Sequence, residues 1–344
     1  MQSNNHVIVA CAGGGKTTCI IERALAQQEE RVLITTYTNE NLFEIRKKII
    51  DLHGFVPENL TINSWYTMLL HDFVRPYQKI LLPEAHIRSV DFVSTPPRFA
   101  SRDDNPKSYF LNKNFDIYRD RVSDFVFHCN NQSKGLIIKR LEQIYGHIYI
   151  DEMQDLAGWD FDIVELLMES SILITMVGDP RQNTFQTNNS IKNKGFTFQR
   201  WVEKLKTEKG CIEEHRTQCY RSNQAICNFA DALYPEYPRT SSFSQDHTGH
   251  DGVFFIPAND IHSYIEEFNP QILRHSIKSN TYGYVALNFG LSKGKTFDRV
   301  LIVPTKPIKE YLQSKDPSGL QPRSKSLLYV AITRAKFSVA FIMD

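Results

Sequence analysis

The sequence predicts an α/β protein in which parallel sheets are flanked by helices. An apolar segment, HVIVA (6–10), is followed by a glycine run and then by KTTCIIERALA, which starts at Lys16 and has apolar residues at helical spacing. Two further apolar segments, in GHIYIDEMQD (146–155) and SILITMVGDPRQ (171–182), each end in a polar cluster. Polar groups at strand ends are typical of open α/β sheets, which bind ligands at the carboxyl ends of their strands.

Length and composition narrow the class of protein. The 344 residues favour two or three domains, each able to bury its own core. The composition, 41% hydrophobic and 23% charged, is that of a soluble globular protein. The net charge of +1 gives no overall basic field, so a nucleic-acid partner would have to be held by local patches. No apolar run approaches the roughly 20 residues of a membrane span, so we expect no membrane partner.

The six cysteines suggest free thiols in a reducing cytoplasm, which is the expected location. Cys211, His215, Cys219 and Cys227 could in principle form a metal site. Their spacing lacks the close C-x2-C pairs of zinc modules, so buried structural cysteines are the preferred interpretation.

The glycine run has the features of a phosphate-binding loop. A strand that stops abruptly, glycines whose N–H groups can approach phosphates, and a helix N-terminus are all predicted here. Lys16 would reach the β and γ phosphates, and Thr17 would hold Mg²⁺. Ala10 stands where the G-x-x-x-x-G-K-[ST] pattern has its first glycine, and a glycine-rich turn without a ligand is the alternative. The residues expected to bind the nucleotide here are Ala12, Gly13, Gly14, Gly15, Lys16, Thr17 and Thr18.

The polar clusters after the next two strands suit the same chemistry. Asp151 is placed to bind Mg²⁺, directly or through water. Glu152 could orient and deprotonate an attacking water, and Gln182 could sense the γ-phosphate. A solvated acidic strand end is the alternative for the two acids.

Seven segments follow one another in the chain: ACAGGGKT (10–17), TTYTNENLFEIRKKI (35–49), DEMQD (151–155), VGDPRQ (177–182), CYRS (219–222), SKGKTFDRVLI (292–302) and YVAITRAK (329–336). In this order they resemble the motifs of the superfamily 1 helicases, specifically the UvrD/Rep/PcrA group, and the resemblance spans nearly the whole chain.

The resemblance implies two RecA-like P-loop NTPase domains, with ATP and Mg²⁺ in the cleft between them and a small insertion in the first domain. The implied bounds are 1–75 and 131–205 for the first RecA-like domain, 76–130 for the inserted subdomain and 206–344 for the second RecA-like domain. It also implies that Tyr220 stacks on the adenine and that Arg221 and Arg334 contact the γ-phosphate. A surface salt bridge is the alternative for either arginine.

The chain departs from the group in several places. The adenine-reading glutamine motif would lie upstream of residue 1, which leaves Tyr220 as the expected base contact. In NTFQTNNS (183–190), Phe185 can stand for one aromatic, but Thr187 and Asn188 occupy the tryptophan and arginine places of the group's W-R-G-A text. Gly290 and Thr296 replace the usual histidine and glutamate of the sixth motif.

The group's large insertion between the motifs at Arg221 and Lys293 is expected to be absent. The intervening residues are needed for the second core, where we expect strands at 252–257 and 282–287 with a helix between them.

DNA-facing residues are implied by their positions in the motifs: Tyr37, Asn39, Ser64, Trp65, Phe185 and Lys293. Trp65 could equally be a core residue. Basic and aromatic residues interleave at 98–121, which suits single-stranded nucleic acid, a protein-contact subdomain or a small satellite core.

The expected function is an ATP-dependent single-stranded DNA translocase or helicase, moving 3′ to 5′ by resemblance. The alternative is an ATP-gated regulatory subunit docked on another protein such as a nuclease, because compact proteins of this kind resemble the helicase-like subunit of anti-phage systems such as Gabija. An inactive scaffold is a third hypothesis, disfavoured by the intact Lys16, Asp151, Glu152 and Arg334.

Overall fold

The structure, a computed structural model, describes residues 5–193, 195–196 and 198–343. The chain divides into two compact units. The first comprises Met1–Ile8, Lys16–Gly178 and Phe185–Glu214, and the second comprises Val9–Gly15, Asp179–Thr184 and His215–Asp344. The predicted outer domain bounds, residues 1 and 344, lie outside the described residues.

The first unit is built on a sheet whose described strands number six. Their order is β3 (Leu60–Ser64), β2 (Val32–Thr36), β6 (His147–Ile150), β7 (Leu173–Gly178), β1 (His6–Ala10) and β8 (Ile212–Arg216). Strand β2 pairs in parallel with β3 and with β6, and β6 pairs in parallel with β7. The expected strand at 6–10 is confirmed as β1, and the expected parallel α/β class is confirmed with it.

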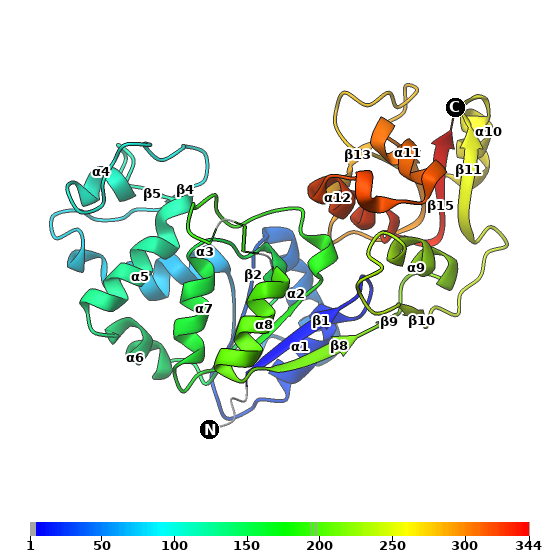
Figure 1. Cartoon of the computed structure of the whole chain (residues 1–344). Helices are drawn as coiled ribbons and strands as arrows, with labels where there is room; N and C mark the ends of the chain where they lie inside the picture. Colours follow the sequence, from blue (N-terminus) through cyan, green and yellow to red (C-terminus); the bar gives the residue numbers. More distant parts are fainter. Residues whose placement is uncertain (1–4, 194, 197, 344) are drawn as a thin grey trace. The chain divides into compact units, whose positions relative to one another are not determined.

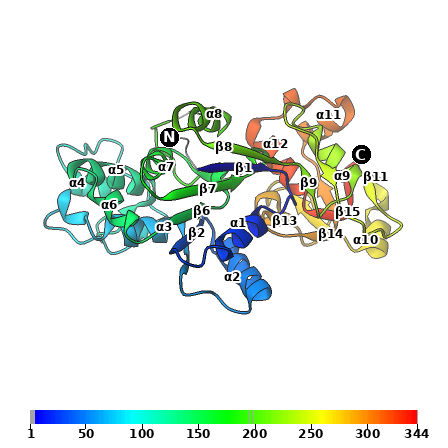
Figure 2. The same ribbon diagram turned by 90° about the horizontal axis from the view of Figure 1, so that it is seen from below.

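Helices cover both faces of this sheet (Figures 1 and 2). Helices α1 (Lys16–Leu25) and α2 (Asn39–His53) lie on one face, and α7 (Asp160–Met168) and α8 (Phe198–Lys209) lie on the other. The Thr38 side chain caps α2 by accepting from the Asn41 N–H, and Gly54 ends the helix in the left-handed conformation.

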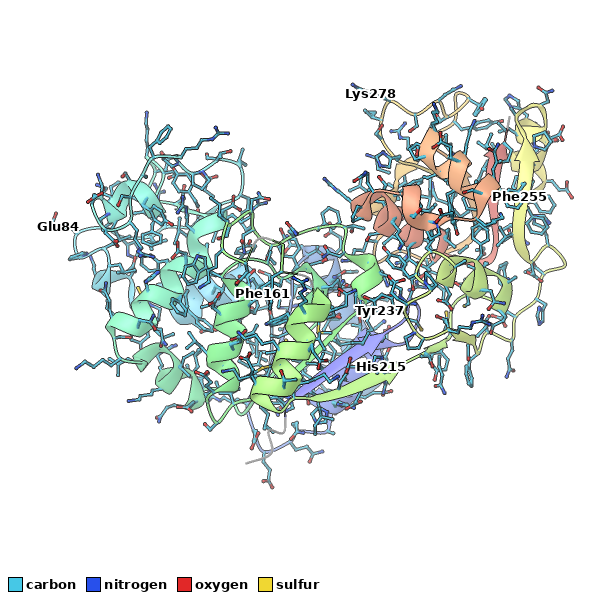
Figure 3. The ribbon with its side chains drawn as sticks, viewed as in Figure 1. Glu84, Phe161, His215, Tyr237, Phe255 and Lys278 are labelled. Carbon is cyan, nitrogen blue, oxygen red and sulfur yellow. The ribbon has the colours of Figure 1, made fainter. Side chains whose placement is uncertain are left out.

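The apolar stripes of these helices account for the core of the first unit. Ile20 and Ile21 of α1 and Ile45 and Ile49 of α2 pack on strand residues such as Ile34. On the other face, the Phe161 ring of α7 lies 4.6 Å from the Trp201 ring of α8; Figure 3 labels Phe161 there.

Between β3 and β6 the chain forms the inserted part of the first unit. Its described elements are α3 (Trp65–Met68), the π-helix η1 (Leu69–Val74), η2 (Gln78–Ile80), β4 (Val90–Asp91), α4 (Pro106–Phe110), β5 (Ile117–Tyr118), η3 (Arg119–Arg121), α5 (Val122–Gln132) and α6 (Leu136–Glu142). Within this insertion Phe110 packs edge-on against Phe125 at 4.9 Å, so the insertion has a small core of its own, whereas Phe99 is 99% exposed.

Two short η helices lie outside the insertion: η4 (Met153–Asp155) follows β6, and η5 (Pro180–Gln182) follows β7.

The second unit contains a parallel sheet of β11 (Gly252–Pro257), β15 (Ala335–Met343), β14 (Phe297–Val303), β12 (Gln271–Arg274) and β13 (Leu287–Asn288), in that order. Its other described elements are β9 (Gln218–Cys219), β10 (Ser241–Ser242), α9 (Gln224–Asp231), η6 (Ala258–Asp260), α10 (Ile261–Phe268), η7 (Phe289–Ser292), α11 (Lys306–Ser314), η8 (Pro317–Gly319) and α12 (Pro322–Ile332). Along β14, Val300 and Ile302 join one apolar cluster while Leu301 and Val303 join another, so both faces of the sheet are buried.

One expected strand is wrong. The strand at 252–257 is confirmed as β11 and the expected helix follows as α10, but most of 282–287 is irregular. Tyr282 and Gly283 have φ values of 55° and 86°, and the Tyr284 N–H bonds back to the Thr281 carbonyl. Two successive residues with positive φ turn the chain and cannot continue a strand. The second strand of this region is β12, which the apolar pattern did not indicate.

Among the described residues, no helix combines the length and the apolar character that crossing a bilayer requires.

Candidate nucleotide and nucleic-acid sites

The glycine loop after β1 requires glycine for two reasons: its backbone conformation, and the close contact that other residues make with it. Gly13 and Gly15 have φ values of +72° and +68°, in the left-handed region that favours glycine. A Cβ on Gly13 would lie 2.8 Å from Cys219 Sγ and 2.9 Å from Arg221 Cβ, so only glycine fits there. The Tyr220 N–H also donates to the Gly13 carbonyl at 3.0 Å. Within the second unit, the CYRS segment is therefore packed directly against this loop.

In the first unit, Thr17 and Asp151 meet. The Thr17 hydroxyl donates to Asp151 Oδ2 at 2.9 Å, and the Glu152 N–H donates to Asp151 Oδ1 at 2.9 Å. Burial, together with the neighbouring Glu152 carboxylate, raises the pKa of Asp151 to about 6. A hydroxyl beside a buried carboxylate is an oxygen donor set that suits Mg²⁺, so these two residues fit the expected metal.

Glu152 has an unusual backbone. Its φ of 57° is left-handed, although it is not a glycine, and the side-chain amide of Gln154 donates to its carboxylate. A strained residue of this kind persists only when its surroundings over-determine it, and such strain clusters at functional sites. Lys16 opens α1, one residue before Thr17.

Gln182 and Arg334 are brought together in the second unit. Arg334 Nη2 donates to Gln182 Oε1 at 3.2 Å, and Arg334 Nε donates to the Val330 carbonyl at 3.1 Å. Arg334 is 2% exposed, which does not fit the alternative of a surface salt bridge. Arg221 is half-buried and donates to the Thr333 carbonyl at 3.0 Å.

Sequence reasoning missed Arg181, which lies beside Gln182 and is buried. Its guanidinium bonds Asp179 at 2.8 Å and Asp231 at 3.1 Å, and the Tyr329 hydroxyl donates to Asp179 at 3.2 Å. These bonds tie the turn that carries Gln182 to helices α9 and α12. A buried arginine with two carboxylate partners has no local sequence signature.

Phe243 was missed as well. The Tyr220 and Phe243 rings are both more than half exposed, and their centres are 5.7 Å apart. The Phe243 N–H donates to the Cys219 carbonyl at 2.7 Å, which fixes it beside Tyr220. The Tyr220 hydroxyl donates to Gln218 Oε1 at 2.8 Å. The two rings are tilted by 45°, so a base that stacks on Tyr220 would have the Phe243 ring beside it.

All six cysteines are buried thiols, as the preferred interpretation stated. Cys11, Cys219 and Cys227 pack together near the glycine loop. In the part of the chain that the structure describes, no group of three or more His, Cys, Asp or Glu side chains is arranged to hold a metal ion.

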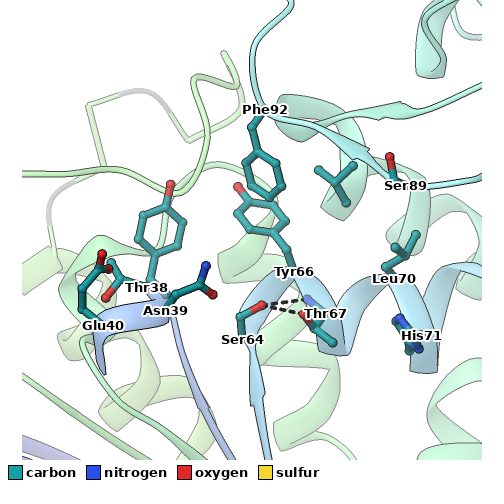
Figure 4. Close-up of a pocket in the computed structure, with 12 residues that line it drawn as sticks. Thr38, Asn39, Glu40, Ser64, Tyr66, Thr67, Leu70, His71, Ser89 and Phe92 are labelled. Atoms are coloured by element: carbon teal, nitrogen blue, oxygen red, sulfur yellow. Dashed lines mark hydrogen bonds between the residues drawn. The ribbon is translucent and has the colours of Figure 1, made fainter. Parts of the chain in front are cut away.

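Three expected DNA-facing residues share one pocket of about 520 Å³ in the first unit, which we call the aromatic pocket (Figure 4). Tyr37 follows β2, Asn39 opens α2, and Ser64 ends β3 and caps α3. The complete lining is Tyr37, Thr38, Asn39, Glu40, Ser64, Tyr66, Thr67, Leu70, His71, Ser89, Val90 and Phe92. Tyr66 and Phe92 had not been expected there, and no motif marks them.

Trp65 is a core residue, so its assignment as a DNA-facing residue is corrected. Its side chain is buried, and Nε1 donates to Asp160 at 3.0 Å. A buried, hydrogen-bonded indole has no free face on which a base could stack. Phe185 is 37% exposed and Lys293 is half-buried after η7, but neither lines the aromatic pocket.

Thr187 and Asn188, at the places of the group's tryptophan and arginine, are also buried. Both donate to the Asp160 carboxylate, as does the hydroxyl of Ser123. The hydroxyl of Tyr66 donates to the Thr187 carbonyl. This loop therefore supports the floor of the aromatic pocket instead of presenting side chains for stacking.

Comparison with known proteins identifies the family of this chain. A family model described as an AAA domain matches residues 1–188, and one described as a viral superfamily 1 RNA helicase core domain matches residues 110–343. A search of curated proteins finds no match.

Among solved structures, the Arterivirus nonstructural protein 10 helicase aligns with a TM-score of 0.52 and 14% identity, over 98% of this chain and 59% of that one. The same helicase in complex with DNA aligns with a TM-score of 0.52 and 14% identity, over 99% of this chain and 60% of that one. The chain thus spans about three fifths of the helicases it matches, and these likenesses establish a shared fold.

Proposed function

This chain belongs to the superfamily 1 helicases, and we propose that it is an ATP-driven translocase on single-stranded DNA, able to act as a helicase. The observation that carries the proposal is the bonded pair of Thr17 and Asp151 beside the strained Glu152. These groups, and a glycine loop that ends just before Thr17 in the chain and tolerates no side chain at Gly13, are what triphosphate hydrolysis requires.

We assign the residues to roles as follows. Lys16 and the N–H groups of the glycine loop bind the phosphates, and Thr17 and Asp151 hold Mg²⁺, which supplies charge neutralisation when bound. Glu152 accepts the proton of the water that attacks the γ-phosphorus, which leaves ADP and inorganic phosphate. Gln182, Arg221 and Arg334 contact the γ-phosphate, where arginine contacts are typically worth about 10³ to 10⁵ in rate.

The adenine base of the nucleotide is bound by stacking on Tyr220 and Phe243. Aromatic rings stack on any base, so this platform favours tolerance among purine nucleotides over strict reading of adenine. The ratio of kcat/KM for ATP to that for GTP tests this assignment, and Phe243→Ala should raise KM for both nucleotides while changing kcat little.

The single strand of nucleic acid is bound at the aromatic pocket, which Tyr37, Asn39 and Ser64 line. The complex of the Arterivirus helicase with DNA supports a nucleic-acid partner. Measuring ATP turnover alone and with single-stranded DNA, single-stranded RNA or duplex tests the motor. We expect strong stimulation by single strands, and turnover that no polynucleotide stimulates would refute the proposal.

The 3′ to 5′ direction is tested with strands that carry biotin-bound streptavidin at one end. A protein that moves 3′ to 5′ should release streptavidin from the 5′ end and not from the 3′ end.

One observation favours the second candidate, an ATP-gated subunit of a larger complex such as a nuclease. Phe43 and Ile50, one helical face of α2, are exposed, and Phe55 beyond the helix is exposed too. Exposed apolar residues that gather on one element often mark a protein contact. Purification from the native host distinguishes the two candidates, because a protein that comes alone and moves on DNA excludes the second.

A further inference from the structure

We propose that Cys219 is an oxidation site: hydrogen peroxide joins Cys219 and Cys227 in a disulfide, and this bond reversibly lowers ATP turnover. The inference rests on the proposed ATPase function and adds to it a chemical control located in the second unit. It concerns two side chains to which the nucleotide assignment gives no role.

Three thiols gather against the glycine loop within the second unit. Cys11, Cys219 and Cys227 form one contact cluster, and all three are buried. Cys11 directly follows β1, Cys219 ends β9, and Cys227 lies in α9. The other three cysteines of the chain lie outside this cluster. The fold thus brings together thiols from three segments and leaves further thiols elsewhere as internal controls.

Cys219 and Cys227 are the pair that is placed to react. The Cys227 thiol donates to the Ser222 carbonyl at 3.7 Å and is within hydrogen-bond reach of Cys219 Sγ. The Ser222 N–H also donates to Cys219 Sγ, at 3.4 Å. The Cys11 thiol instead donates to the Gln218 carbonyl at 3.5 Å. These contacts favour a bond between Cys219 and Cys227 over one that includes Cys11.

The surroundings make the two thiols of this pair unequal. The hydrogen bond from Cys227 and the Ser222 N–H lower the pKa of the Cys219 thiol, although burial acts against them. The N–H group and the charge of Arg221 lower it further. The same hydrogen bond, together with burial, raises the pKa of Cys227, which therefore keeps its proton. Cys219 is thus the thiolate that attacks an oxidant, and Cys227 is the thiol that closes the disulfide.

A small cavity gives an oxidant a place beside the pair. Its volume is about 10 Å³, and its lining includes Cys219, Cys227, Ser222 and Thr240. This is about the space that one water molecule needs. Hydrogen peroxide is one oxygen atom larger than water and carries no charge, so a slight widening of the cavity admits it. A bulky oxidant such as a peptide disulfide is kept away by the burial of both sulfurs.

One peroxide molecule supplies one disulfide. The Cys219 thiolate attacks a peroxide oxygen, the O–O bond breaks, and the hydroxide that leaves takes up a proton to become water. The Cys227 sulfur then attacks the sulfenic acid at Cys219, and an S–S bond replaces the S–O bond. The departing hydroxide takes the Cys227 proton and becomes a second water. The two sulfurs lose two electrons, which the peroxide gains, and a dithiol reductant reverses the change.

A disulfide at this place disturbs the contact with the glycine loop. Its sulfurs lie about 2.05 Å apart, closer than unbonded sulfur atoms approach. Cys219 Sγ lies 2.8 Å from the place of a Cβ on Gly13, and the Tyr220 N–H donates to the Gly13 carbonyl at 3.0 Å. Drawing Cys219 towards α9 therefore shifts Tyr220 and Arg221, the residues assigned to the base and the γ-phosphate. Because a displacement of about 1 Å can lower a rate about 100-fold, turnover should fall about ten- to a hundredfold.

The test treats the reduced protein with hydrogen peroxide and follows ATP turnover together with the masses of its tryptic peptides. Trypsin cuts after Arg221, so Cys219 and Cys227 fall in separate peptides, 217–221 and 222–239. We expect these two peptides to appear joined, with the loss of two hydrogen atoms, as turnover falls. Dithiothreitol should separate the peptides and restore turnover.

Two serine variants are compared with the wild type. Cys227→Ser keeps a donor for the Ser222 carbonyl, so the reduced variant should hydrolyse ATP normally. Under peroxide it should form no bridge and keep most of its turnover, because nothing draws Cys219 towards α9. Cys129→Ser removes a buried thiol of the first unit, whose pKa burial raises to about 12, and should be inactivated like the wild type.

The outcomes separate this inference from the proposed function. A treated wild type without the joined peptides, or one that keeps its turnover although they are joined, would overturn the inference. A bridge to the peptide that holds Cys11, or an equal loss of turnover in Cys227→Ser, would overturn it as well. The peptide masses of the wild type decide the matter even if Cys227→Ser folds poorly. A reduced wild type that hydrolyses no ATP would instead overturn the proposed function, whatever its peptides show.

Discussion

The glycine loop and the aromatic pocket both follow strands of the six-stranded sheet, yet they are built differently. The loop depends on backbone: Gly13 and Gly15 have positive φ, and Cys219 and Arg221 occupy the space where a Cβ on Gly13 would lie. The pocket depends on side chains, of which Phe92 is more than half exposed. A site made of backbone tolerates almost no substitution. In a site made of exposed rings, each ring that is removed should lower the binding affinity by its own share.

The largest effect is expected at Glu152, which separates chemistry from binding most sharply. Glu152→Gln keeps the shape of the side chain but removes the proton acceptor, so ATP turnover should fall by about 10² to 10⁴. Binding of ATP, measured with a fluorescent analogue, should persist. Glu58→Gln, at an exposed position outside both sites, is the control. Wild-type turnover in Glu152→Gln would show that this residue is not the base.

Two alanine variants test whether the glycine loop needs glycine only for its backbone conformation or also because other residues pack closely against it. Gly15→Ala should cost about 1–2 kcal/mol of unfolding free energy, because its φ is positive but its Cβ meets open space. Gly13→Ala adds the clash with Cys219 and Arg221 and should cost about 2–4 kcal/mol. Urea unfolding measures both, and equal losses would mean that the packing against the CYRS segment contributes nothing.

Asp160 tests the support beneath the pocket. Its buried carboxylate accepts from Trp65, Thr187 and Asn188, among other donors. Asp160→Asn places an amide among these donors and should lower the unfolding free energy by about 2–3 kcal/mol. Strand affinity should also fall several-fold, because Thr187 positions Tyr66. Asp162→Asn, which loses a surface pair with Lys192, should cost at most about 1 kcal/mol. If Asp160→Asn binds strands like the wild type, the pocket does not depend on this support.

His147 provides a reference outside both sites, at the opposite end of β6 from Asp151. Burial lowers the pKa of His147 to about 4, and its ring stacks on Tyr149 and bonds Thr175 at 2.9 Å. Because the unfolded chain takes up a proton near pH 6.5 and the folded chain does not, stability should fall as the pH drops from 6.5 towards 4. The expected loss between pH 7 and pH 5 is about 2 kcal/mol. Urea unfolding of His147→Gln at both values should show a smaller loss, and an unchanged loss would exclude His147 as the cause.

Much of the nucleotide site could be predicted because its parts are local. Strand β1, the glycines and the start of α1 are consecutive, and each has a residue type that its conformation demands. Asp151 and Glu152 follow a strand that is buried along its whole length. The segment 282–287 shows where apolar pattern fails, because the positive φ at Tyr282 overrides a strand-like sequence.

The pocket could be predicted only in part. Tyr37, Asn39 and Ser64 belong to motifs, whereas Phe92 lies in an insertion that no motif covers. The sequence alone does not decide where Trp65 lies, because an indole suits a core and a stacking surface equally well. Its burial against Asp160 was decided by a residue 95 positions away.

The order of the amino acids alone is enough to assign this chain to an α/β fold with a phosphate loop and acidic strand ends. Those features arise within a few residues, from glycine conformation, side-chain branching and the alternation of apolar positions. Contacts between segments far apart in the chain decide which rings line the pocket. They also decide that Arg181 is buried beside Gln182 and that Trp65 is buried in the core. Such contacts form only when the sheets and helices pack, because burial and hydrogen-bond partners are properties of the folded chain and not of any short stretch of it.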